Sequence, residues 1–562
     1  MKKIILTLVG CFLISFFCIQ VFAQSGAEQP AKRPHDWWQA DPQKDSLPGI
    51  SLDEAYNYLK GRKSKPVIVA IIDDCIDTSH EDLKNILWTN KKEIAGNGID
   101  DDKNGYVDDV HGWCFVCGKN NTSQNDEAPD GVRTYITWRK QFENIDTSTL
   151  TGSLKIEYSM YQLSKKKVFA EYKKMADSYQ LITLAKAMRV DTFHFMQYLN
   201  NLSVRYKDTI LYNIPFATIP FSTSYDSLEN IFWSVFNEKR KEDAQAATLE
   251  YLIGFMKALD GEKYFFETMI GIDNLYDTTK NYRMVEGDDD NDFKTIYGAP
   301  TIKVPGHSDW HATLIAGIIA ANRQNNIGIK GIADNVLLMP VVIGKEAPSR
   351  DKDIVFAIHY AVDNGASIIN LSMGGTPAYS EHVKEIMEAF DYASRHGVLF
   401  VNCAGNDGVN MDNEIYNLGQ GSNGKDHDDY IRVGATTTLL NDSLVSVFSN
   451  FGGKTVDLFA PGTAIYSTTP GNKYDFGNGT SFATPVVVGV AALLKSYFPS
   501  LTAKQLKEIL VKSVYKPDIM VITPYNSGIK NKIPFSTMSK SGGIVNAYNA
   551  VKLADEMTRK EK

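Results

Sequence analysis

The amino-acid sequence predicts an α/β fold built on a doubly wound, mainly parallel sheet. Short, uninterrupted apolar runs are typical of strands that are buried on both faces. Beyond residue 300 these runs alternate with helical patterns, and repeated strand–helix units place helices on both faces of a parallel sheet. The expected strands are 67–72, 336–343, 366–371, 398–403 and 456–460. The expected helices are 309–322, 352–364, 381–396, 481–497 and 502–512.

The N-terminal segment has the pattern of an export signal. A pair of lysines precedes an apolar run from Ile4 to Ile19, and the small residue Ala23 provides a cleavage site. The run is shorter than the about 20 apolar residues that a membrane span usually needs, although an uncleaved anchor is the alternative. We therefore expect removal of residues 1–23 and a secreted protein, periplasmic or extracellular, with no membrane span in its mature form.

The composition of the chain argues against some classes of function. A net charge of −8 without basic clusters gives no support for nucleic-acid binding. Of the six cysteines, Cys11 and Cys18 lie in the signal, and the remaining four are too few for a disulfide framework. A packed core must therefore hold the fold together. Cys114 and Cys117 have the spacing of a metal or redox site, but buried cysteines on a strand are the simpler interpretation.

The first candidate for a functional residue follows the first expected strand. The N-terminal arm covers residues 24–64: residues 24–50 are broken by prolines and predict an extended stretch, and a short helix is expected to follow at 51–60. The strand at 67–72 then ends in Asp73. Because open α/β sheets keep their functional groups at the carboxyl ends of their strands, Asp73 is a candidate catalytic carboxylate.

An acidic turn at residues 98–109 has the spacing of a calcium loop. Its candidate ligands are Asp100, Asp102, Asn104, the carbonyl of Tyr106, and Asp108. His111 stands where an EF-hand has glutamate, so the turn is not an EF-hand. We expect a structural Ca²⁺ here, with a solvated acidic turn as the alternative, and no cofactor for the chemistry itself.

Residues 119–285 have helical rather than strand periodicity and predict a large all-helical insertion domain. Ile156, Met160 and Leu163, for example, fall on one helical face. Because a domain cannot be threaded through a packed core, the insertion must project from the surface. We expect it at the rim of the functional cleft, where it narrows access, while an appendage on a distant face is the alternative.

A nucleophile is expected at Ser481, where a loop with two glycines opens a long apolar helix. The free N–H groups and the helix dipole favour a developing negative charge there, so the hydroxyl is placed to attack a carbonyl. His311 begins another helix and is the candidate base. The chain order Asp73, His311, Ser481 is one of three known orders for a catalytic triad. Asn406 follows a buried strand and can supply an amide to an oxyanion hole, with a turn asparagine as the alternative.

Together these segments resemble the subtilisin-like serine proteases, the subtilase or peptidase S8 family. The similar motifs are Ile72–Asp77 around the aspartate, His311–Gly317 around the histidine, Ala404–Asn406 at the oxyanion position and Gly479–Pro485 around the serine. The resemblance implies a subtilisin-like catalytic domain at 65–118 and 286–562, interrupted by the insertion at 119–285. It also implies a substrate-binding strand that lines the specificity pocket, formed by Ser372, Met373, Gly374 and Gly375.

The same resemblance implies a serine endopeptidase that acts on protein or peptide substrates. Ser481 is the implied nucleophile, His311 the general base and later the acid, and Asp73 the carboxylate that orients His311. Asn406 and the backbone N–H of Ser481 are the implied oxyanion donors.

Departures from the family pattern leave a second function open. Asp74 and Cys75 stand where the family has serine or threonine followed by glycine, and Ala312 and Leu314 replace a glycine and a second histidine. We expect the charge of Asp74 to alter the pKa of His311. We also expect Cys75 to lie close to His311, with a buried, inert thiol as the alternative. The alternative function is a catalytically silent subtilase fold that binds peptides by strand addition.

Overall fold

The computed structural model describes residues 35–117, 130–166 and, with short gaps, 289–560. The expected export signal and most of the expected insertion lie outside the described residues. Residues 33–165 and 278–562 form one compact unit.

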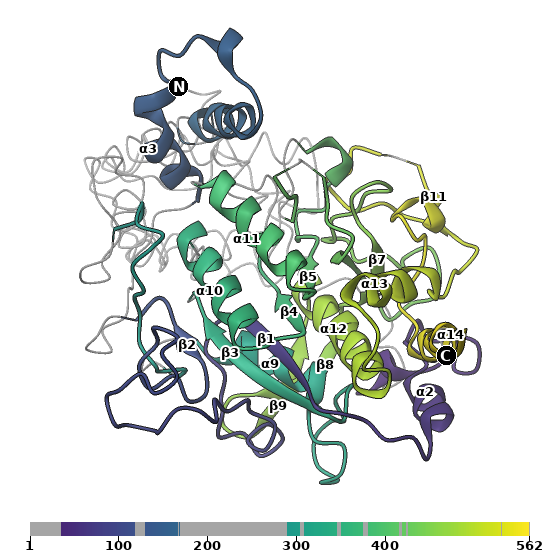
Figure 1. Ribbon diagram of the computed structural model, residues 1–562. Helices are drawn as coiled ribbons and strands as arrows, with labels where there is room; N and C mark the ends of the chain where they lie inside the picture. Colours follow the sequence, from purple (N-terminus) through teal and green to yellow (C-terminus); the bar gives the residue numbers. More distant parts are fainter. Residues whose placement is uncertain are drawn as a thin grey trace, which may run out of the picture. The chain divides into compact units, whose positions relative to one another are not determined.

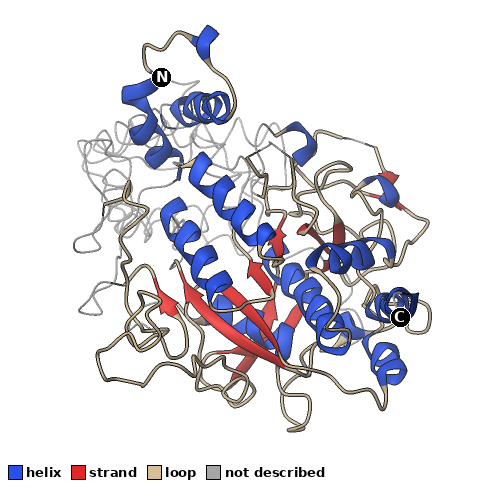
Figure 2. Ribbon diagram, in the orientation of Figure 1, coloured by secondary structure: helices blue, strands red, loops and turns tan. Residues whose placement is uncertain are grey.

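A seven-stranded sheet forms the centre of this unit (Figure 1, Figure 2). Its strands are β1 (Val67–Asp73), β2 (Trp113–Cys114), β3 (Val336–Val342), β4 (Ile368–Leu371), β5 (Leu399–Cys403), β6 (Tyr430–Thr436) and β7 (Leu458–Pro461). The strand order is β2-β3-β1-β4-β5-β6-β7, and every neighbouring pair is parallel. The expected α/β fold with a mainly parallel sheet is therefore confirmed.

Helices cover both faces of the sheet. They are α2 (Leu52–Leu59), α9 (Trp310–Ala320), α10 (Asp351–Asp363), α11 (Val383–Arg395), α12 (Thr480–Tyr497), α13 (Ala503–Lys512) and α14 (Ala547–Lys560), while α3 (Asp130–Phe142) lies away from the sheet (Figure 1). Alternate residues of a strand point to opposite faces. Accordingly, Val69 and Ile71 join one core with α2, α9 and α12–α14, whereas Ala70 and Ile72 join a second core with α10 and α11.

Smaller elements complete the described fold. Two antiparallel hairpins pair β8 (Ile465–Thr469) with β9 (Lys473–Gly477) and β10 (Met520–Val521) with β11 (Ile533–Pro534). The 3₁₀ helices are η1 (Trp37–Gln39), η2 (Thr147–Thr149), η6 (Met411–Asn413) and η7 (Phe535–Thr537).

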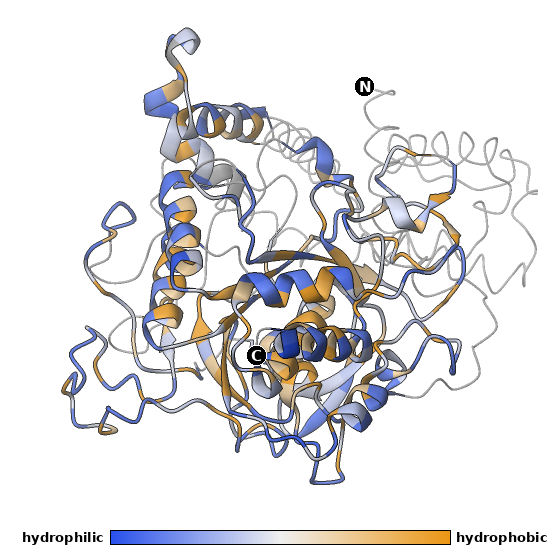
Figure 3. Cartoon of the chain, turned by 45° about the vertical axis from the view of Figure 1, so that its right-hand side comes forward, coloured by the Kyte–Doolittle hydropathy of each residue, from blue (hydrophilic) through white to orange (hydrophobic). Residues whose placement is uncertain are grey.

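The helix α12 is long and apolar enough to cross a membrane, yet 83% of its apolar window is buried inside the unit. Apolar residues gather on the sheet and on the helices that pack against it, while the outer helices alternate apolar and polar sides (Figure 3). The composition of α12 is therefore that of a core helix.

The segment before β1 differs from the expected extended arm. Trp37 and Trp38 are 2% and 0% exposed and belong to the same core as α12. The indole N–H of Trp37 also donates a hydrogen bond to the carbonyl of Ala464. Two adjacent indoles bury a large apolar area, which outweighs the tendency of the surrounding prolines to keep the chain extended.

The described start of the insertion packs against α11 and the segment before it. Met160 of the helical stretch 153–166 joins Val383 and Met387 of α11 in one apolar cluster. The indole N–H of Trp138 in α3 donates to the carbonyl of Ser380, just before α11. In Figure 1, α3 lies beside one end of α11. The described residues 130–165 therefore belong to the same compact unit as the sheet.

Candidate active site

The candidate catalytic residues come from four elements that meet at one edge of the sheet. Asp73 is the last residue of β1, and Asn406 comes three residues after β5. His311 and Ser481 are each the second residue of a helix, α9 and α12. Because the carboxyl ends of parallel strands share one edge, the fold gathers Asp73 and Asn406 there, and the two helices begin at the same edge.

Asp73 and His311 form a close buried pair. The Nδ1 of His311 lies 2.7 Å from Oδ1 of Asp73. A carboxylate only accepts hydrogen bonds, so Nδ1 carries the proton and Nε2 remains available as a base. The Asp73 side chain is 1% exposed, whereas 26% of His311 is exposed. The backbone N–H of Asp74 donates to the same Oδ1 at 2.8 Å and further fixes the carboxylate.

Opposing effects determine the pKa of His311. Burial favours the neutral imidazole and lowers the pKa, but the negative charge of Asp73, its hydrogen bond and the charge of Asp74 each raise it. The net effect is a pKa above the usual histidine value. The expected influence of Asp74 on His311 is therefore present, and its direction is upward.

Replacing Asp74 by asparagine should move the acidic limb of the kcat/KM profile to lower pH. The base must be neutral to act, so activity falls as the pH drops through the pKa of His311. Removing the Asp74 charge removes one influence that raises this pKa. The measurement is kcat/KM against pH for both proteins. Asp428→Asn, at an exposed ion pair with Lys504, is the control, and a limb that stays in place or moves to higher pH in Asp74→Asn would contradict the assignment.

The packing of Phe482 places the start of α12 beside this pair. The Phe482 ring follows Ser481 in α12, and its centre is 5.3 Å from the centre of the His311 ring. Gly477 makes room for the ring, since a Cβ there would lie 2.7 Å from it. Among the described residues no hydrogen bond joins Ser481 Oγ to His311. In enzymes without substrate such contacts are often long and tighten on binding.

Two hydrogen-bond donors converge beside the serine. Oδ1 of Asn406 accepts from both the N–H and the hydroxyl of Thr480, each at 2.9 Å, which fixes the orientation of the amide. Its Nδ2 then faces the same side of Gly479 as the N–H of Ser481. A Cβ built on Gly479 would lie 3.7 Å from the former and 3.6 Å from the latter. An oxyanion hole needs two donors aimed at one point, and these two lie on the same side of Gly479.

The loop that carries Asn406 is held by a residue that the sequence did not indicate. Asn450 donates from Nδ2 to the carbonyl of Ala404, and its Oδ1 accepts from the N–H groups of Asp407 and Val409. Gly405 has φ +98°, and a Cβ there would lie 2.5 Å from the Asn450 amide. Asn450 is fully buried, so this loop is rigid where it supports the amide of Asn406.

The expected substrate-binding strand continues β4 toward the serine. The hydroxyl of Ser372 donates to the carbonyl of Ser481 at 2.8 Å and accepts from Nδ2 of Asn370 at 3.0 Å. Met373 and Gly374 follow within the described chain, whereas Gly375 lies outside the described residues. The described part of the strand thus runs directly past the candidate nucleophile.

In the acidic turn, Asp100 and Asp102 lie together with a third acid. One oxygen from each of them and one from Glu93 fall within 4.8 Å of one another. Asp108 instead accepts from the N–H groups of Asn97 and Gly98. Asn104 donates a hydrogen bond to Asp109 within the turn, whereas Tyr106 connects the turn to the protein by packing against Trp113 and Tyr360. Burial raises the pKa of Asp109 to about 6.

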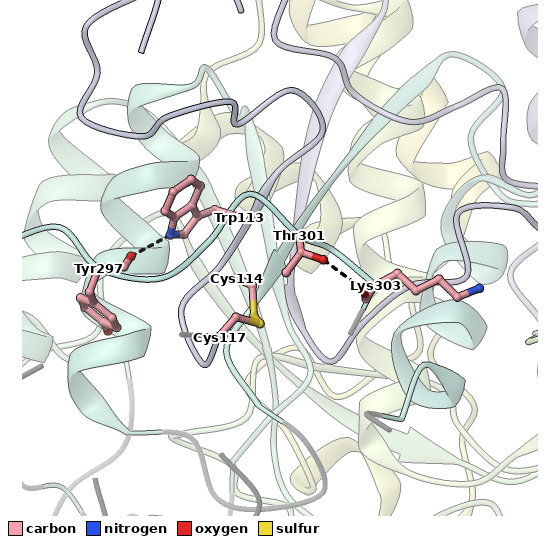
Figure 4. The surroundings of a disulfide bond; sticks show 6 residues. All are labelled: Trp113, Cys114, Cys117, Tyr297, Thr301 and Lys303. Atoms are coloured by element: carbon pink, nitrogen blue, oxygen red, sulfur yellow. Dashed lines mark hydrogen bonds between the residues drawn. A yellow bond between two sulfur atoms is a disulfide. The ribbon is translucent and has the colours of Figure 1, made fainter. Parts of the chain in front are cut away.

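The cysteines differ from expectation in one respect. Cys114 and Cys117 are buried, as expected for strand cysteines, but they are joined by a disulfide (Figure 4). A turn brings their Cα atoms to 5.6 Å, a separation that a disulfide can bridge, and sequence spacing alone did not reveal this turn. Cys75 is 1% exposed and clusters with this disulfide, as the alternative of a buried thiol anticipated.

Comparisons with known proteins find similar sequences and structures. The model of the family described as "Subtilase family" matches residues 64–531. Subtilisin DY from Bacillus licheniformis is 34% identical over 223 residues, which is 39% of this chain and 76% of that protein. The thermophilic serine proteinase of Bacillus sp. (strain AK1) is 39% identical over 187 residues, and the alignment covers 33% of this chain and 42% of that protein.

Two further proteins are similar to this chain. The major intracellular serine protease of Bacillus subtilis (strain 168) is 38% identical over 200 residues, 35% of this chain and 59% of that protein. Among solved structures, a protease from Pseudoalteromonas arctica PAMC 21717 aligns with a TM-score of 0.35 and 28% identity over 43% of this chain and 70% of that chain. The chain therefore spans less than two thirds of several of its relatives.

Proposed function

Because the chain belongs to the subtilase family of serine proteases, we propose that it is an exported serine endopeptidase whose nucleophile is Ser481. The observation that carries the proposal is the pairing of Asp73 with His311 at 2.7 Å beside the start of α12. The two N–H donors that converge next to Ser481 support the same reaction. Export is proposed from the N-terminal pattern alone, since one of the relatives is named as intracellular.

In the proposed mechanism, Oγ of Ser481 attacks the scissile carbonyl carbon while Nε2 of His311 takes the hydroxyl proton. Asp73 holds the imidazole in the required tautomer and stabilises the imidazolium. The carbonyl oxygen becomes negatively charged and accepts hydrogen bonds from Nδ2 of Asn406 and the N–H of Ser481. His311 then gives its proton to the leaving amine, and water cleaves the acyl-enzyme with His311 again acting as base.

The proposed specificity comes from strand pairing. The part of the substrate that forms the acyl group would add a strand along residues 372–374, which run past Ser481. A protein that only binds peptides would use the same edge, so the test must detect bond cleavage. We expect an unfolded protein substrate to yield internal fragments on incubation with the purified protein, as seen by mass spectrometry, and Ser481→Ala to yield none. Binding without fragments would favour the silent alternative.

A structural Ca²⁺ is proposed at the acidic turn. Carboxylate oxygens are the ligands that Ca²⁺ prefers, and those of Glu93, Asp100 and Asp102 lie close enough to share one ion. Asp108 is a weaker candidate, because its oxygens are not among the three that lie within 4.8 Å of one another. The ion would relieve the repulsion among these acids and hold the turn that connects β1 to β2.

Adding Ca²⁺ should raise the melting temperature by about 2–5 °C at saturation, since an ion that binds only the folded state stabilises it by mass action. Glu93→Gln and Asp100→Asn should each reduce this response, because each removes a charged ligand. Asp428→Asn is again the control at an exposed acid. A melting temperature that is the same in Ca²⁺ and in chelator would exclude the ion.

The helical insertion is proposed to restrict access to the cleft. Helices that follow strands begin at the carboxyl edge of a parallel sheet, so α11 and the preceding Ser380 lie at the edge that holds the active site. Trp138 contacts Ser380, and Met160 contacts α11, so the described start of the insertion lies at this edge. Beyond the insertion, the described chain resumes at residue 289 and passes beside β2, where Ala299 and Cys114 exchange two backbone hydrogen bonds.

Replacing residues 169–277 by a short Gly/Ser linker should raise cleavage of a folded protein several-fold relative to a small peptide ester. The deletion keeps α3 and the stretch 153–166, which pack on the catalytic unit. If the insertion restricts access, its removal admits larger substrates but leaves the chemistry unchanged. The ratio of the two kcat/KM values is the measurement. A stable, active deletion variant with an unchanged ratio would show that the insertion lies away from the cleft.

A further inference from the structure

Exposed apolar side chains lie on the segments that pack against the loop of Asn406, and they have no role in the mechanism above. Val447 is 49% exposed, Ile522 is 48% exposed and Tyr525 is 61% exposed. Single exposed apolar residues are common on protein surfaces, but several that share one region often mark a binding site. We call these three residues the apolar face.

The apolar face is held in place by specific hydrogen bonds. The N–H of Tyr525 donates to the carbonyl of Val447 at 3.2 Å, and that of Ile522 donates to the carbonyl of Asp442 at 2.8 Å. The neighbouring side chain of Asn526 donates to the carbonyl of Asp407 at 2.7 Å. These bonds fix the segment that follows β10 against two loops of the catalytic unit.

One contact joins the apolar face directly to the loop that carries Asn406, which we call the oxyanion loop. The hydroxyl of Tyr525 donates to the backbone carbonyl of Asn406 at 3.4 Å. A Cβ on Gly408 would lie 3.1 Å from the carbonyl of Val447 and 3.3 Å from the Tyr525 ring, so the two segments touch. The ring is therefore anchored through its backbone at one end and through its hydroxyl at the other.

The order of the strands shows which side of the scissile bond the apolar face adjoins. β4, β5 and β6 are neighbours in that order. Ser372 follows β4, Asn406 follows β5, and Val447 lies in the segment that returns to β6 through the bridge between Thr436 and Val445. Asn406 thus lies between the strand at 372–374 and the apolar face. Because the strand holds the acyl side of the substrate and Asn406 holds the carbonyl, the face adjoins the leaving-group side.

We propose that the apolar face binds an apolar side chain of the substrate on the leaving-group side of the scissile bond. The occupant is the substrate polypeptide itself, within the first residues after the cleaved bond. The proposal rests on the proposed endopeptidase function. The Tyr525 ring provides a rigid surface of large area, and such rings bind apolar groups with little loss of conformational entropy.

The test isolates leaving-group binding by acyl transfer. A peptide ester forms the acyl-enzyme, and an added amine competes with water: its nitrogen attacks the acyl carbon, the Ser481 oxygen leaves, and His311 carries the amine proton to that oxygen. The measured quantity is the ratio of amide product to acid product. We expect leucinamide to give a higher ratio than glycinamide, and Tyr525→Ala to lower the leucinamide ratio about five- to tenfold with little change for glycinamide.

Two controls separate the ring from other effects. Tyr525→Phe removes the hydrogen bond to Asn406 but keeps the ring, so it should preserve the leucinamide preference. Ile327→Ala, at a 40% exposed position in the loop after α9, should change neither ratio. A leucinamide ratio that is unchanged in Tyr525→Ala would overturn the proposal. This holds also if the apolar face were found to bind a second copy of the chain instead of substrate. Failure to form any acyl-enzyme would instead contradict the proposed function.

Discussion

Replacing Ser481 by alanine is expected to lower kcat for a peptide ester by about five to six orders of magnitude, and replacing His311 by alanine should cost about as much. The serine forms the covalent bond to the substrate and the histidine accepts the serine proton, so neither residue can catalyse the reaction without the other. The pairing of His311 with Asp73 at 2.7 Å supports this assignment. KM should change far less than kcat, because neither side chain belongs to the proposed substrate-binding strand.

The double variant shows whether Ser481 and His311 act together or contribute independently to kcat. Ser481→Ala with His311→Ala should be little slower than either single variant, since the unit has already been lost. Melting temperatures within a few degrees of the native protein would show that the fold is intact. Losses that multiply in the double variant would mean that Ser481 and His311 do not act together, and the peptide-binding alternative would then be favoured.

Replacing Asn406 by alanine is expected to lower kcat by about 10²–10³-fold with little change in KM. Its Nδ2 faces the place where negative charge develops, so it contributes mainly in the transition state. Asn406→Asp is the more stringent test of the role of the Asn406 donor. It can still accept the hydrogen bonds from Thr480 but loses the donor and adds a negative charge, so its kcat should fall at least as far.

Controls for this prediction come from the same structure. Asn335→Ala, in the turn that precedes β3 at the opposite edge of the sheet, should leave kcat unchanged. The measurement is kcat and KM for one ester substrate across the three variants. If Asn406→Ala raised KM and left kcat intact, the amide would bind substrate and transition state equally, and the oxyanion assignment would be wrong.

The candidate catalytic residues could be predicted because each belongs to a short local motif. Asp73 ends an apolar strand, and Ser481 lies in the first turn of a helix whose N-cap is Gly479, so the neighbouring sequence fixes the local structure of each. β6 could not be predicted in the same way. Its central Arg432 is 1% exposed and interrupts the apolar pattern, and its charge is satisfied by Asp426 and the carbonyl of Thr455.

Other parts of the site depend on contacts between distant segments. Glu93 joins the acidic turn from outside the calcium-like spacing, and Asn450 holds the oxyanion loop from more than 40 residues away. Tyr525 reaches Asn406 across 119 positions. The helical period at 153–166 likewise predicted a helix but not its packing on α11. Such partners are decided by tertiary packing, which a one-dimensional pattern does not contain.

The most direct measurement of the central claim is covalent labelling of the purified protein with a fluorophosphonate. The serine oxygen of an active triad attacks phosphorus and displaces fluoride, whereas an ordinary surface serine does not react. Peptide mass spectrometry should locate one label per chain on Ser481, with Ser481→Ala unlabelled and His311→Ala labelled far more slowly. Native protein that stays unlabelled, or a label on another residue, would contradict the account.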